Sequence, residues 1–82
     1  MKFWIQHNTL EACYCFLCIE FFQKKESIIF VKQSMPYSFE YKVKFSSLKQ
    51  AKDVFDYLCK LVSEQVSYIN LNEVIEKAGN GI

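Results

Sequence analysis

Three closely spaced cysteines are the first residues of this chain that could do chemistry. Cys13, Cys15 and Cys18 form a Cys-x-Cys-x-x-Cys cluster, and three thiolates with a fourth ligand can hold zinc in a tetrahedron. Cys59 or His7 would have to supply that ligand. In a strand, however, Cys18 would face away from the other two. No Gly, Pro, Asn or Asp lies between the cysteines to make a tight ligand loop. We therefore interpret the cysteines as small buried hydrophobes, with a metal-binding module as an alternative, and expect no cofactor.

Other signs of catalysis are weak. His7 is the only histidine, so no Ser-His-Asp or Cys-His pairing follows from spacing. Asp53 and Asp56 resemble a carboxylate pair but lie among lysines, where exposed and ion-paired side chains are the default. The only glycines, Gly79 and Gly81, are at the tail, so no glycine-rich phosphate loop is present. We expect a protein that is not an enzyme.

The N-terminal residues and the hydropathy pattern predict a soluble, cytoplasmic protein that does not bind membranes. Polar residues interrupt the first eight positions, which do not resemble a signal peptide. The longest apolar run, residues 12–19, is far shorter than the roughly 20 residues that span a bilayer. In a reducing compartment we expect thiols rather than disulfides.

The composition predicts one small domain with more apolar material than its core can hold. A chain of 82 residues forms a single domain (1–82) that buries only about 60% of its unfolded surface. Yet 51% of the residues are hydrophobic and 17% are aromatic. This surplus indicates self-association or binding of a partner.

The clearest structural pattern runs from Tyr37 into the middle of the chain. Apolar and polar residues alternate strictly over 37–45, which predicts a half-buried strand. Ser47 and Gln50 fit a capping box that would begin a helix over 47–64. Six residues share the expected buried arc of that helix: Leu48, Ala51, Phe55, Leu58, Cys59 and Val62.

The remaining segments predict an α+β fold. We expect an antiparallel meander of three to four strands (about 2–7, 13–22, 28–32 and 37–45), the helix 47–64 packed on it, and a short second helix over 71–78. The segment 9–25 is ambiguous, because its ends carry helix-capping signals while its centre is aromatic and rich in cysteine. We favour a strand there, and a βαββα fold is the alternative.

Aromatic residues outside the expected helix contacts are the candidate binding site. Trp4, Tyr14, Phe16 and Phe22 cannot all face one small core if the helix covers only one side of the sheet. Aromatic residues with few charges are typical of interface centres. We therefore expect a small regulatory or binding protein of the adaptor or inhibitor type, which contacts protein partners and self-associates as a homodimer or other homo-oligomer.

A strip of lysines supports an alternative function, binding of nucleic acid. Lys42 and Lys44 would lie on the exposed strand face, and Lys49 and Lys52 on the following helix. The ten basic residues include no arginine, and the net charge is only +1. The aromatic residues of the strand would point away from the lysines, whereas binders of single strands combine both on one surface. Nucleic acid is therefore the less favoured partner.

Overall fold

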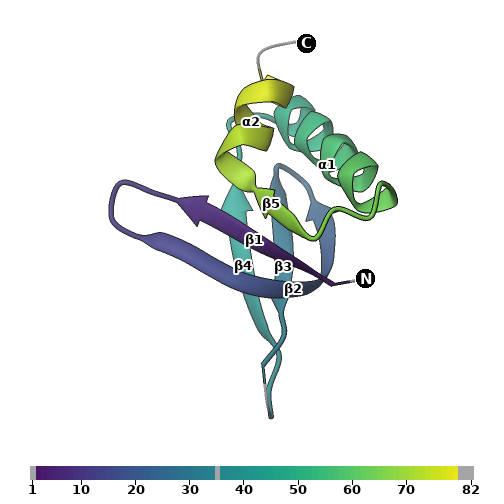
Figure 1. Cartoon of the computed structure of the whole chain (residues 1–82). Coiled ribbons are helices and arrows are strands. Elements are labelled where there is room, and N and C mark those ends of the chain that lie inside the picture. Colours follow the sequence, from purple (N-terminus) through teal and green to yellow (C-terminus); the bar gives the residue numbers. More distant parts are fainter. Residues whose placement is uncertain (1, 35, 80–82) are drawn as a thin grey trace.

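In the described part of the chain, residues 2–34 and 36–79 of a computed structural model, five strands form one mixed sheet in the order β4-β3-β2-β1-β5 (Figure 1). The strands are β1 (Phe3–Asn8), β2 (Cys13–Lys24), β3 (Ser27–Lys32), β4 (Phe39–Lys44) and β5 (Tyr68–Asn70). Strands β1 to β4 are antiparallel neighbours, and β5 pairs with β1 in parallel. The predicted α+β meander is therefore confirmed.

The ambiguous segment 9–25 contains a strand, so its helical alternative is wrong. The first half of β2 pairs with β1, and its second half pairs with β3. The backbone hydrogen bonds that a helix would have made within the segment are made to two neighbouring strands instead. The last predicted strand begins at Phe39 rather than at residue 37, and β5 is an addition to the three or four strands expected.

A β-bulge divides β2 at Ile19. Cys18 pairs with Lys32 and Glu20 pairs with Val31, so Ile19 is an extra residue in the ladder. The bulge reverses the alternation: Cys18 faces the core before it, and Phe21 faces the core after it. The same bulge lies where β2 leaves β1 and joins β3, and the β1–β2 hairpin runs across β3 and β4 (Figure 1).

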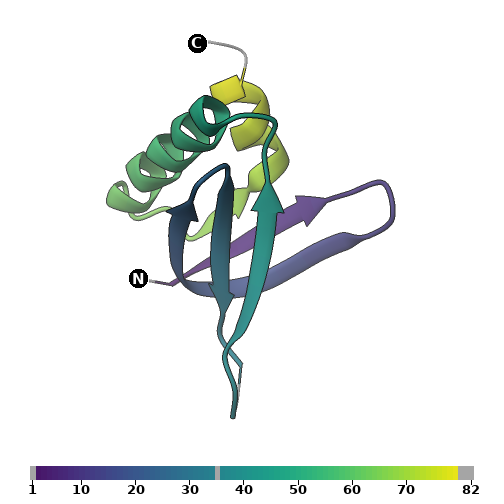
Figure 2. The same ribbon diagram turned by 180° about the vertical axis from the view of Figure 1, so that it is seen from behind.

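Helices α1 (Leu48–Ser63) and α2 (Leu71–Gly79) lie on one side of the sheet (Figures 1 and 2). Both predicted helices are thus confirmed within one residue. Neither described helix combines the length and the apolar character needed to cross a membrane. The core lies between the helices and the inner face of the sheet and consists of Phe3, Ile5, Phe16, Cys18, Ile28, Phe30, Val43, Phe45, Ala51, Val54, Leu58, Ile69, Leu71 and Val74.

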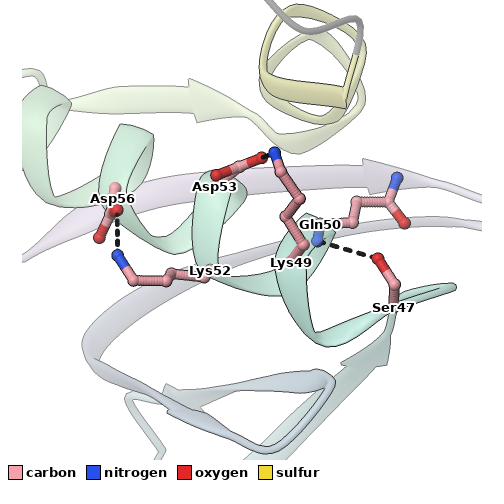
Figure 3. Close-up of polar contacts among 6 residues, drawn as sticks. All are labelled: Ser47, Lys49, Gln50, Lys52, Asp53 and Asp56. Atoms are coloured by element: carbon pink, nitrogen blue, oxygen red, sulfur yellow. Dashed lines mark hydrogen bonds and ion pairs between the residues drawn. The ribbon is translucent and has the colours of Figure 1, made fainter.

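The N-terminus of α1 carries half of the predicted capping box. The backbone amide of Gln50 donates to the Ser47 hydroxyl at 3.1 Å (Figure 3). The Gln50 side chain, however, accepts from the backbone amide and hydroxyl of Ser46 rather than from Ser47. The serine therefore satisfies one of the free amides of the first turn, as an N-cap does.

The buried side of α1 is rotated slightly from the predicted arc. Ala51, Val54 and Leu58 are buried, whereas Leu48 and Cys59 are exposed. At about 100° per residue, Val54 lies next to Leu58 beyond one edge of the predicted arc, and Leu48 and Cys59 lie together at the opposite edge. The shift towards Val54 therefore turns Leu48 and Cys59 towards solvent. The helix still presents one apolar face to the sheet.

Candidate functional site

The two described helices leave one face of the sheet uncovered, and we call it the outer face. Ile28 and Phe30 of β3 belong to the core cluster, whereas Ile29 and Val31 do not. Because successive side chains of a strand point to opposite faces, Ile29 and Val31 lie on the outer face. The strand register then assigns the outer-face residues of the neighbouring strands.

Nine outer-face residues form three rows across β2, β3 and β4, and we call them together the outer patch. The acidic row is Glu20, Val31 and Glu40; the middle row is Phe22, Ile29 and Lys42; the basic row is Lys24, Ser27 and Lys44. The members of a row lie directly opposite one another on adjacent strands, close enough for their side chains to touch.

The outer patch has a closely packed centre and exposed margins. Ile29 and Val31 are only 8% and 9% exposed although no described helix covers them. Their neighbours on β2 and β4 are exposed, and Phe22 keeps 37% of its surface accessible. The surface therefore has an apolar centre, one exposed aromatic ring and margins of opposite charge at its two ends.

A second apolar area lies on the outer face of β1. Trp4 is opposite Leu17 on β2 and Tyr68 on β5, and Trp4 and Tyr68 are about half exposed, at 50% and 48%. The Tyr68 hydroxyl donates to the side-chain carbonyl of Gln6, and this hydrogen bond holds the tyrosine ring against β1, the strand that carries Trp4.

The four aromatic residues predicted to bind a partner lie on two different faces. Trp4 and Phe22 are on the outer face and exposed. Phe16 is buried in the core cluster. Tyr14 is exposed but shares the inner face with Phe16, because the two residues are two positions apart on one strand. The structure thus brings only half of the predicted set to the uncovered face.

The inner face carries an aromatic cluster beyond the helices. Tyr41 packs against the rings of His7, Tyr14 and Phe16, with ring centroids 5.0 to 5.7 Å away. His7 Nδ1 and the Tyr41 hydroxyl lie 2.5 Å apart in a hydrogen bond. Burial lowers the pKa of His7 and raises the pKa of Tyr41, so both groups favour their neutral forms.

The cysteines do not converge. Cys13 and Cys15 are exposed on the outer face, Cys18 is buried on the inner face, and Cys59 is exposed on α1. The expectation of buried cysteines is therefore right for Cys18 and wrong for the other three. Burial raises the pKa of the Cys18 thiol, which donates to the Glu20 carbonyl at 3.2 Å. Within residues 2–34 and 36–79, no group of three metal-ligating side chains comes together.

The predicted lysine strip is divided between two layers. Lys42 and Lys44 project from the outer face of β4. Lys49 and Lys52 lie on α1 and pair with Asp53 and Asp56, each at 2.9 Å (Figure 3). The hydrogen bond and charge of the Asp56 carboxylate raise the pKa of Lys52.

An open groove of about 710 Å³ lies where α1 and α2 meet. Its lining is largely charged, and Lys49 and Asp53 in it already pair with each other. Lys60 lies over the ring of Tyr57, 5.8 Å from the ring centre. Because Lys49, Asp53 and Lys60 already have partners within the groove, we assign it no ligand.

Comparisons with protein-family models, with curated proteins and with solved structures found no match. Functional inference therefore depends on the outer face itself. Sequence reasoning missed Glu20, Glu40 and Lys24 as members of a candidate site. Only the register, with its bulge at Ile19, shows that residues from three strands form ordered rows.

Proposed function

We propose that this chain is a small, non-enzymatic binding protein that works through contacts with another protein on the outer face of its sheet. The observation that carries the proposal is a sheet face with an apolar centre and charged margins that no described helix covers. Interfaces have this composition, with aromatic and aliphatic side chains at the centre and polar groups around them. An adaptor or an inhibitor would use such a surface.

Phe22 is the best candidate for an anchor residue. It lies opposite Ile29 at the centre of the outer patch, and 37% of its surface is accessible. A partner that covers this phenyl ring removes its exposed apolar area from water. Each Å² of apolar area buried in this way favours binding by about 25 cal/mol. Trp4 and Tyr68 extend the apolar surface along β1 and β5.

The nucleic-acid alternative has less support. Lys42 and Lys44 share their strand face with Glu40, and the two helix lysines are paired with aspartates. Oligonucleotide binding through these lysines would fall steeply with salt concentration. Capture of binding partners at two salt concentrations therefore distinguishes a protein partner from nucleic acid.

The test is affinity capture from native lysate at two salt concentrations, with the captured molecules identified. We expect the wild-type chain to capture a protein, either a different one or a second copy of the chain. The Phe22→Ser variant should fail to capture it. Leu10→Ser is the matched control, because Leu10 is a fully exposed leucine outside the outer patch. Capture that Phe22→Ser leaves unchanged, or salt-sensitive capture of nucleic acid alone, would contradict the proposal.

A further inference from the structure

We propose that the protein docked on the outer patch is a second copy of this chain, turned so that the acidic row of each copy lies on the basic row of the other. The inference rests on the proposed function, because it names the partner of the same face. The distribution of charge over the outer patch carries it.

Opposite charges are separated along the strands of the outer patch. Glu20 and Glu40 flank one end, and Lys24 and Lys44 flank the other. The two rows are four positions apart along each strand, which is about 13 Å. This exceeds the Debye length of about 8 Å at physiological salt, so the rows do not neutralise each other. Each chain therefore carries an acidic end and a basic end on one surface.

Such a surface is complementary to itself in one orientation. Two sheets packed face to face keep their strands within about 30° of one another. A two-fold axis along the middle row reverses the strands of the second copy and lays its basic row over the acidic row of the first. An axis along the strands would instead superimpose like charges, which is unfavourable. The charges select the first arrangement.

This arrangement defines the contacts at the axis and on both sides of it. Glu20 faces Lys24 of the second copy, and Glu40 faces Lys44 of the second copy. Phe22 meets its own counterpart in the middle row, where two rings can pack together. The exposed ring of each copy is thereby covered without any rearrangement of the sheet.

Lys42 is the residue that this arrangement does not favour. It ends the middle row on β4, so the axis brings two Lys42 side chains towards each other at the margin. Their long stems let the ammonium groups turn to solvent. Lys42→Gln removes this repulsion, so we expect it to lower the dimer dissociation constant or leave it unchanged.

The experiment reverses each charged row separately. E20K/E40K makes both ends of the patch basic, and K24E/K44E makes both ends acidic. In sedimentation velocity at low salt, we expect the wild-type chain to dimerise and each variant to dissociate about tenfold more readily, because four facing pairs become repulsive. K49E/K52E is the control, because it changes the same number of lysines on α1 and should dimerise like the wild type.

Mixing the two variants is the decisive step. Because one variant is basic where the other is acidic, an equimolar mixture should form a heterodimer at concentrations where each variant alone is monomeric. The combined variant E20K/E40K/K24E/K44E should recover the homodimer, since its ends are exchanged. All substituted positions are exposed, and circular dichroism checks that the variants fold.

Three results would overturn the inference: a monomeric wild type at every concentration, a dimer insensitive to both reversals, or a mixture that stays monomeric. The proposed function has a separate outcome. If the wild type is monomeric but captures a different protein through Phe22, the binding function stands and the second copy is the wrong partner. If neither occurs, both proposals fail.

Discussion

His7 on β1 and Tyr41 on β4 share a hydrogen bond, with Nδ1 and the hydroxyl oxygen 2.5 Å apart, although β2 and β3 lie between their strands. Two strands that are not neighbours touch in this way only if the sheet is strongly curved. The curvature brings β1 towards β4 on the inner face and leaves the opposite face turned outward. This contact therefore belongs to the geometry that exposes the outer patch.

The first prediction concerns the pH dependence of stability. Burial lowers the pKa of His7 below its usual value of 6.5, so the unfolded chain takes up this proton first as the pH falls. The stabilisation from neutral His7 is complete above about pH 7.5 and is lost as the pH falls through 6.5 towards the lowered folded value. Chemical denaturation between these pH values should show this loss.

His7→Phe is the control, because it keeps a ring against Tyr41 and removes the titrating group. Its unfolding free energy should vary less over the same pH range than that of the wild type. The ionisable group that hydrogen-bonds to His7 is the Tyr41 phenol, whose pKa burial raises above its usual value of 10, so it stays neutral over this pH range. Equal slopes for the two proteins would show that His7 is not buried as described.

The second prediction concerns thiol reactivity. Cys13, Cys15 and Cys59 are exposed and should react with a maleimide in the folded protein. Cys18 is fully buried, and its pKa is raised, so it should react only after unfolding. Mass spectrometry of the native and denatured protein counts the modified thiols. Four fast sites in the native state would refute the position of Cys18.

The third prediction compares two leucines of α1. Leu58 is fully buried in the core cluster, and Leu48 is exposed at the first turn. Leu58→Ala should lower the free energy of unfolding by about 2–5 kcal/mol through lost burial and a cavity. Leu48→Ala should change it by less than about 0.5 kcal/mol. Similar losses in urea denaturation would contradict the observed rotation of the helix.

Local patterns in the sequence were enough to predict most of the elements. Strict alternation before Phe45 and the serine cap at Ser47 identify a strand followed by a helix, because both signals depend only on neighbouring residues. The outer patch depends instead on pairing between distant strands. Ile19 also interrupts the alternation of β2, so that neither period fits the whole strand. The two faces could therefore not be separated from the sequence alone.

The most direct test of the central claim, that a second copy of this chain docks on the outer patch, is an NMR dilution series of the isotope-labelled wild-type chain. The amide and side-chain signals of Phe22 and Ile29 should shift as concentration rises, together with those of Glu20 and Lys24, while signals of α1 stay constant. A spectrum independent of concentration, or shifts confined to α1, would contradict the account.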